Sequence, residues 1–191
     1  MLFMNRFYQC ILIGSTVLLS WLGMQIVHEF GHVLGAWFSG GTVAKVVLHP
    51  LTISYTTLTT NPHPLLTVWA GPVIGAALPL AVWSCAAACR LPGSYLLRFF
   101  AGFCLIANGA YIGVGSLARI GDPAVMLSNG APVWQLWTFG AATAPLGLWL
   151  WHGLGKHFGL GKASKKNHPL AAYVILLLLI FTIAIEWAFD G

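Results

Sequence analysis

The chain has 191 residues, of which 58% are hydrophobic and only 7% are charged. Since soluble domains carry roughly 25% charged residues, this composition excludes a water-soluble globule. The net charge is +5, but the basic residues stand mostly singly between apolar runs and no aromatic residues interleave them, which argues against nucleic acid as a partner. We expect a membrane protein that has the lipid bilayer as its surroundings.

Five apolar segments are long enough to cross a hydrocarbon core about 30 Å thick, which takes about 20 helical residues. They cover residues 9–38, 65–89, 96–118, 133–152 and 169–189. The first continues well past the apolar region of a signal peptide and has no A-x-A cleavage site, so we expect a helix there. The sequence therefore predicts an all-α, multi-pass membrane protein with about five transmembrane helices, in a single domain over residues 1–191.

Residues 42–60 differ from the helical segments because they are rich in β-branched residues and alternate in part. Gly40-Gly41 stops the helix before them, and Pro50 interrupts them near the middle. They predict two short strands, a β-hairpin-like segment at the membrane boundary. A free strand edge there can pair with an extended peptide, and a plain covering loop is an equally good interpretation.

The basic residues between the spans predict the orientation of the chain. With the N-terminus in the cytoplasm, the inside segments hold seven Lys or Arg residues and the outside segments hold only Lys45 and Arg119. This asymmetry favours a cytoplasmic N-terminus and a C-terminus outside. The inside set is Arg6, Arg90, Arg98, Lys156, Lys162, Lys165 and Lys166.

Small side chains in the spans are interpreted as packing residues. The four cysteines, Cys10, Cys85, Cys89 and Cys104, fall in apolar stretches and form no CxxC pair. Ala70-Gly71-Pro72 opens a run of small residues in the second span, which allows another helix to approach closely. We expect the second span to pack against the first.

The main chemical signal is His28-Glu29-Phe30-Gly31-His32. Residues i and i+4 of a helix lie on one face, so both imidazoles can reach a single metal ion. Zinc fits histidine nitrogens with one open position for water, and the intervening glutamate can accept a proton from that water. The alternative is a pair of buried histidines beside a glutamate that faces lipid or a neighbouring helix, but a carboxylate in the membrane interior costs about 2.5–3.5 kcal/mol. We expect one Zn²⁺ ion on His28 and His32, with Glu29 as the catalytic base.

Asp122 is the best candidate for a third metal ligand. The first and third spans run in the same direction, so their C-terminal ends meet at one face, and Asp122 follows the third span. The alternative for Asp122 is a helix N-cap before Pro123. Glu186, near the end of the fifth span, is the second candidate for the third ligand. His49 and His63 can contact metal or substrate, although a histidine in such a segment is more often a loop residue.

Asn108 is a polar amide inside the third span. We expect its side chain to hydrogen-bond a metal ligand, the water on the metal or the substrate backbone, and we assign it to substrate or transition-state binding. An interhelical hydrogen bond without a catalytic role is an equally good interpretation.

These motifs resemble the site-2-protease class of intramembrane zinc metallopeptidases, the M50 family, and are most similar to its short M50B-like branch. The matching pieces lie within about residues 20–135. They are His28-Glu29-Phe30-Gly31-His32 followed by Gly40-Gly41 and a valine-rich strand, then Ala70-Gly71-Pro72, and finally Gly121-Asp122-Pro123-Ala124-Val125-Met126-Leu127 leading to Gly130-Ala131-Pro132. The resemblance implies that His28, His32 and Asp122 bind zinc and that Glu29 activates water.

The resemblance further implies an intramembrane zinc-dependent endopeptidase, an enzyme that hydrolyses peptide bonds of transmembrane protein substrates. Two alternatives stay open. In the first, the chain is a non-catalytic metal-binding membrane protein whose metal is a structural staple. In the second, it is a small transporter subunit in which Glu29, Asn108 and Asp122 line an ion path.

Overall fold

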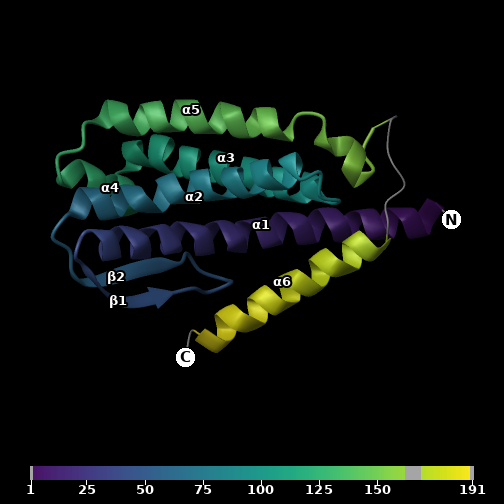
Figure 1. Cartoon of the computed structure of the whole chain (residues 1–191), viewed down its shortest axis with the longest axis horizontal. Coiled ribbons are helices and arrows are strands. Elements are labelled where there is room, and N and C mark those ends of the chain that lie inside the picture. The colour runs from purple at the N-terminus through teal and green to yellow at the C-terminus, as the bar shows by residue number, and fades with distance from the viewer. Residues whose placement is uncertain (1, 162–168, 190–191) are drawn as a thin grey trace.

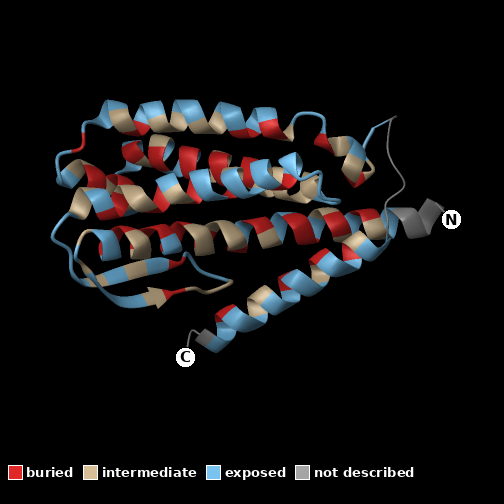
Figure 2. Ribbon diagram, in the orientation of Figure 1, coloured by how far each residue is buried: buried red, intermediate tan, exposed pale blue. Residues whose placement is uncertain are grey.

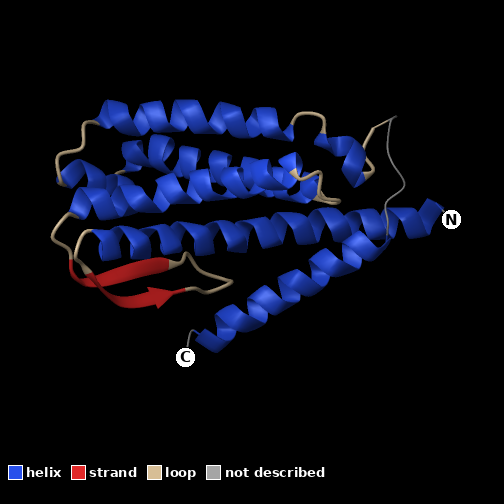
Figure 3. Cartoon of the chain, viewed as in Figure 1, coloured by secondary structure: helices blue, strands red, loops and turns tan. Residues whose placement is uncertain are grey.

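A computed structural model describes residues 2–161 and 169–189, and these form six α-helices, a short 3₁₀ helix and a two-stranded sheet (Figures 1 and 3). In chain order the elements are α1 (Leu2–Phe38), β1 (Thr42–Val47), β2 (Tyr55–Thr60), α2 (Pro64–Ala88), α3 (Ser94–Ala118), α4 (Gly121–Ser128), α5 (Val133–Trp151), η1 (Leu154–Phe158) and α6 (Pro169–Phe189). The prediction of a mostly helical chain with a hairpin after the first helix is confirmed. Lys162, Lys165 and Lys166, which contribute to the predicted orientation, lie outside the described residues.

Four of the five predicted spans are helices long and apolar enough to cross a membrane, among the described residues. These four spans are Arg6–Phe38 in α1, Pro64–Ala88 in α2, Ser94–Ala118 in α3 and Pro169–Ala188 in α6. Many large apolar residues of the helices are exposed, and Figure 2 shows the exposed residues of each helix in pale blue. Leu177 and Phe181 on α6 are 64% and 62% exposed, as suits a face in contact with lipid. Four such helices in one chain indicate a multi-pass membrane protein.

The remaining predicted span, residues 133–152, forms a helix at the expected place, but α5 is not among the four. Its 19 residues hold no charged side chain, yet tryptophan, glutamine and threonine lower its mean hydropathy. α5 packs along α3, where a Cβ added to Gly140 would lie 2.8 Å from the backbone oxygen of Gly109, so the two backbones touch. The total of five transmembrane helices therefore stays a prediction.

The four helices α5, α3, α2 and α1 lie side by side, and α6 crosses α1 on the side away from α5 (Figure 1). A buried cluster of Val68, Ile112, Met126, Ala131 and Leu136 joins α2, α3, α4 and α5. Because Met126 is fully buried in this cluster, the short helix α4 is held against the C-terminal end of α3. This packing fixes the position of the first turn of α4.

The hairpin lies alongside the C-terminal part of α1. β1 and β2 pair antiparallel, with Val47 opposite Tyr55, and the register shifts near Thr42–Lys45. At the tip, the backbone N–H of Ser54 donates to Oε1 of Gln25 at 2.8 Å. Gln25 precedes the end of α1 at Phe38 by thirteen residues, or about 20 Å along the helix, so the hairpin folds back past the histidine motif.

The cysteines are free thiols, and their interior packing role is confirmed only for Cys104, which is fully buried. Cys10, Cys85 and Cys89 are exposed on α1 and α2. A small apolar side chain in a long apolar span can face either the interior or the outside, and its sequence context does not distinguish the two.

Candidate metal centre

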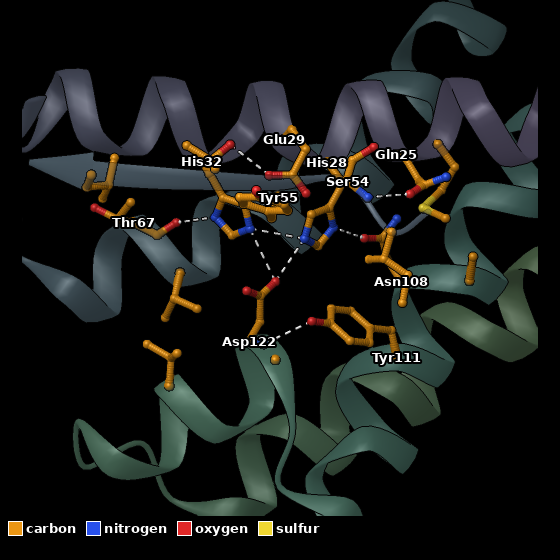
Figure 4. Close-up of a pocket in the computed structure, with 18 of the residues that line it drawn as sticks. Gln25, His28, Glu29, His32, Ser54, Tyr55, Thr67, Asn108, Tyr111 and Asp122 are labelled. Atoms are coloured by element: carbon orange, nitrogen blue, oxygen red, sulfur yellow. Dashed lines mark hydrogen bonds and ion pairs between the residues drawn. The ribbon is translucent and has the colours of Figure 1, made fainter. Parts of the chain in front are cut away.

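His28, Glu29 and His32 lie in the C-terminal half of α1 and are all buried, with exposed fractions of 5–8%. One potential ligand atom from each residue lies within 4.8 Å of the others, so the group can hold a metal ion. Figure 4 shows the two imidazoles side by side, pointing away from α1 toward α4. The helical spacing of the motif therefore produces the juxtaposition that the sequence predicts.

Asp122 reaches the same point from α4. Its Oδ2 lies 2.8 Å from Nε2 of His28 and 3.2 Å from Nε2 of His32, and the two Nε2 atoms are 3.1 Å apart. Two potential ligand atoms from one helix and a third from Asp122, 90 or more positions further along the chain, thus form a nearly equilateral triangle. The proximity predicted for Asp122 is present in the structure.

The Nδ1 atoms of both imidazoles, which are not the ones that face Asp122, contact fixed acceptors. Asn108 donates through Nδ2 to the Cys104 carbonyl at 2.9 Å, so its Oδ1 faces His28 and accepts from Nδ1–H at 2.7 Å. Nδ1–H of His32 donates to the Thr67 carbonyl at 2.9 Å. In the neutral imidazoles, both Nε2 atoms then carry a lone pair.

The triangle consequently consists of two imidazole lone pairs and one carboxylate oxygen. Three such acceptors at 2.8–3.2 Å repel one another unless protons or a metal ion lie between them. Second nitrogens that donate to fixed acceptors are also typical of metal-ligating histidines. The chemistry of the donor set therefore fits a bound metal ion.

The start of α4 places the Asp122 carboxylate. Gly121 has φ +59°, a conformation that favours glycine, and a Cβ at this position would collide with the Tyr111 hydroxyl. That hydroxyl accepts the backbone N–H of Asp122 at 2.9 Å. The N-cap of α4 is Ile120, so the side chain of Asp122 does not cap the helix and faces the histidines instead.

The environment of Asp122 favours its ionised form. Burial raises the pKa of this carboxyl, but when the imidazoles of His28 and His32 also carry a proton on Nε2, their hydrogen bonds and positive charge outweigh burial and hold the pKa well below its usual range. Asp122 is therefore a carboxylate, which is the form that binds a metal ion.

Glu29 lies on the hairpin side of the two histidines. The hydroxyl of Thr56, on β2, donates to Oε2 of Glu29 at 2.7 Å. A hydroxyl can donate only one hydrogen, so this contact fixes one oxygen of the carboxylate. The hairpin thus orients the side chain that the sequence nominates as base.

Small residues of α2 allow the close packing on which the site depends. Gly71 faces the His32 ring so closely that an added Cβ would overlap it, and Gly31 of α1 meets the backbone of Ala70 and Gly71 in the same way. Gly75 packs against the Asn108 amide. The prediction that this run packs against the first helix is confirmed.

A cavity of about 490 Å³ opens beside the histidines and the carboxylates. Its wall is mostly apolar and comes from α1, α2, α3, α4, β2 and the turn before β2 (Figure 4). The polar side chains of the wall include Glu29, Asp122, Asn108 and Thr56. A largely apolar cavity with a few convergent polar groups is the usual form of a small-molecule or peptide site.

The other candidate ligands lie elsewhere. Glu186 is buried on α6, where it interacts electrostatically with His49, and the His49 ring packs on Trp187 at 5.1 Å. His63 is exposed at the start of α2. Among the described residues, none of these three belongs to the group around His28.

Four residues at the site are not among those that the sequence predicts for it: Gln25, Thr56, Thr67 and Tyr111. Thr67 acts through its backbone carbonyl, which every residue possesses, and Thr56 is one of several threonines in a β-branched segment. Gln25 precedes His28 by one helical turn, so its spacing on the metal-facing side was the one available clue. For Asn108, the partner in the structure is a histidine of the motif, which is one of the three partners expected for it.

Comparison of the chain with protein-family models, with curated proteins and with solved structures found no match. The family resemblance therefore rests on the sequence motifs alone, while the capacity of the site to hold a metal ion rests on its own geometry.

Proposed function

We propose that this chain is an intramembrane zinc-dependent endopeptidase of the site-2-protease class, which hydrolyses peptide bonds of transmembrane protein substrates. The observation that carries the proposal is the convergence of His28, His32 and Asp122 on one point, beside Glu29 and an apolar cavity. A purely structural metal site would be closed by a fourth protein ligand and would have no use for the glutamate.

Zinc is the metal that the donor set favours. In a tetrahedral site with zinc–ligand distances near 2.0–2.1 Å, neighbouring donors are about 3.3 Å apart. The three separations of 2.8–3.2 Å among the Nε2 and Oδ2 atoms are all somewhat shorter than that value, two of them by about 0.2 Å or less. When bound, zinc would supply Lewis-acid polarisation of the scissile carbonyl and acidification of a water molecule.

Glu29 is the residue we assign to proton transfer. Its carboxylate takes a proton from the attacking water as the water oxygen bonds to the carbonyl carbon. When the C–N bond breaks, the same carboxyl delivers that proton to the leaving nitrogen, so the residue returns to its starting state. Thr56 holds one oxygen of Glu29, which limits the rotation of the carboxylate during this exchange.

An extended peptide is the substrate class that the cavity favours. β2 has β1 on one side, and no second described strand pairs with its other edge. Residues of β2 and of the turn before it line the cavity, so an extended backbone that lies along β2 would pass the histidines. Peptide groups inside a helix are hydrogen-bonded to one another and are shielded from attack. In an extended segment the peptide bonds are accessible.

The test is the appearance of new peptide ends in a membrane. Full-length chain is reconstituted with a detergent extract of membrane proteins, and the N-termini formed are identified by mass spectrometry. Wild type is expected to produce cleavage sites within transmembrane segments, while Glu29→Gln, which keeps its zinc, produces none of them. Phenanthroline should abolish the cleavage and added zinc should restore it.

Glu186→Gln serves as the matched carboxylate control and should cleave like wild type. The proposal is wrong if wild type and Glu29→Gln, at equal zinc content, give the same peptide ends. The non-catalytic alternative gains support if, in addition, His28→Ala prevents folding.

A further inference from the structure

A second cavity, of about 430 Å³, lies at the end of the helices opposite the metal centre, where α2 ends, α3 begins and η1 follows α5 (Figure 1). Its lining includes Trp83 and Ala87 of α2, Ser94, Tyr95 and Arg98 of α3, and His157 of η1. This end of the helices corresponds to the side that the basic residues predict to be cytoplasmic.

Arg98 is the only charged side chain of that lining that is ionised irrespective of pH. Its Nη2 donates to the His152 carbonyl at 3.1 Å, and its guanidinium lies over the Trp83 ring with Cζ 6.0 Å from the centroid. Its Nε is buried and has no hydrogen-bond partner among the described residues. Arg98 therefore keeps donor capacity that no described protein group uses.

No carboxylate in the described part of the chain pairs with Arg98, since the ion pairs there are those of Asp122 with the two histidines. Glu29 and Asp122 lie at the metal centre, and Glu186 lies beside His49 at the far end of α6. Arg98 is half-buried and its Nη2 contact is exposed, so an anion from outside can reach its guanidinium.

The rest of the lining fits an anion with an attached apolar tail. Gly93 caps α3 without a side-chain oxygen, so the positive end of the helix dipole faces the same region. Tyr95 and His157 stack at 4.9 Å and give the cavity a flat aromatic wall, next to apolar helix faces. Basic pockets between helices at the membrane surface are typical binding places for phospholipid headgroups.

We propose that this cavity binds one phosphate group of an anionic phospholipid, held by the Arg98 guanidinium. The same chemistry would accept a free phosphate, so the experiment separates the two sources. This site is independent of the proposed peptidase function, because its residues do not touch the metal centre.

The experiment uses the purified full-length chain in detergent. Phosphatidylglycerol, phosphatidylcholine or inorganic phosphate is titrated, retained lipid is counted by native mass spectrometry, and thermal unfolding is followed for all three ligands. We expect one phosphatidylglycerol per chain, retained more tightly than phosphatidylcholine, with the melting temperature rising as it binds.

Four variants test the assignment. Arg98→Gln should weaken phosphatidylglycerol binding about 10- to 100-fold, because a charge-assisted hydrogen bond is lost. Arg98→Lys should retain most of the affinity. Ala87→Trp, which fills the cavity without touching the arginine charge, should weaken binding as Arg98→Gln does. Arg90→Gln, an exposed arginine at the same end, should bind like wild type.

The proposal is overturned if Arg98→Gln retains phosphatidylglycerol as tightly as wild type, or if Arg90→Gln weakens it equally. If inorganic phosphate stabilised the wild type but not Arg98→Gln, and phosphatidylglycerol stabilised neither, the cavity would be an anion site whose ligand is not a lipid. That result would overturn the proposal of a phospholipid. Far-ultraviolet circular dichroism reports the folding of every variant, so this test does not depend on the metal centre.

Discussion

Asn108 and His28 are 80 residues apart in sequence, and Oδ1 of the amide accepts Nδ1–H of the imidazole at 2.7 Å. Because the Asn108 Nδ2 is committed to the Cys104 carbonyl, the amide has one orientation, and that orientation turns Nε2 of His28 toward Asp122. A residue of the third span thus sets the tautomer of a histidine in the first.

Asn108→Ala is expected to weaken zinc binding about 10- to 100-fold, since partners of ligating histidines typically contribute that much. Asn108→Asp keeps the acceptor oxygen and should lose less. Zinc affinity is measured by competition with a chromophoric chelator. Equal affinities for Asn108→Ala and wild type would show that the amide does not position His28.

Thr56→Val is expected to lower peptide hydrolysis about tenfold while zinc content stays at the wild-type level. The reason is that a hydrogen bond to the Glu29 carboxylate is lost, and bonds to charged groups contribute about 1.5–3 kcal/mol. Thr59→Val is the control, because Thr59 is exposed on the same strand. Initial cleavage rates of the three proteins, at matched zinc content, give the result. A parallel loss of zinc and activity in Thr56→Val would contradict the assigned role.

Gly71→Ala is expected to displace the His32 ring, because the added Cβ would overlap it. Overpacking of this kind costs about 1–3 kcal/mol, so both zinc affinity and the melting temperature should fall. Gly14→Ala is the matched control, since a Cβ there meets nothing within 4 Å. If both glycine variants keep wild-type zinc affinity, the contact between α2 and His32 is not tight enough to matter.

Gln25→Ala is expected to free the tip of the hairpin, because the Ser54 N–H loses its acceptor on α1. A buried N–H left without a partner costs about 1–3 kcal/mol, so hydrogen exchange at Ser54 should become faster by tenfold or more. Gln9→Ala, which removes contacts to the carbonyls of Phe158 and Gly159 instead, should leave exchange at Ser54 unchanged. Unaltered exchange in Gln25→Ala would mean that other contacts hold the tip.

Much of the fold follows from local rules that the sequence displays. Runs of apolar residues must satisfy their backbone groups internally, so each long run becomes a helix, and the ends of α2, α3 and α5 fall within two residues of prediction. The β-branched run interrupted at Pro50 gives β1 and β2. α5 is a helix as predicted, and it differs from the four candidate spans only in its hydropathy. Tryptophans and polar residues lower that hydropathy without interrupting the helix.

In the candidate site, too, the residues placed by local helix geometry are predictable and those placed by tertiary contacts are not. His28, Glu29 and His32 are predictable because a single helix sets their spacing. For Asp122, the directions of the first and third spans predict only that it lies at the same face of the membrane as the histidines. Its final position depends on Gly121, on the Tyr111 hydroxyl and on the burial of Met126, which are tertiary contacts. Thr67 contributes a backbone carbonyl, and no pattern of side chains predicts which carbonyl will face a ring.

The most direct measurement is the zinc content of the purified full-length chain, determined by inductively coupled plasma mass spectrometry after extensive dialysis. Wild type and Glu186→Gln are expected to retain about one zinc ion per chain. Asp122→Asn, which changes the carboxylate to an amide of the same shape, is expected to retain almost none while remaining folded. If Asp122→Asn retained as much zinc as wild type, or Glu186→Gln lost it, the centre formed by His28, His32 and Asp122 would be contradicted.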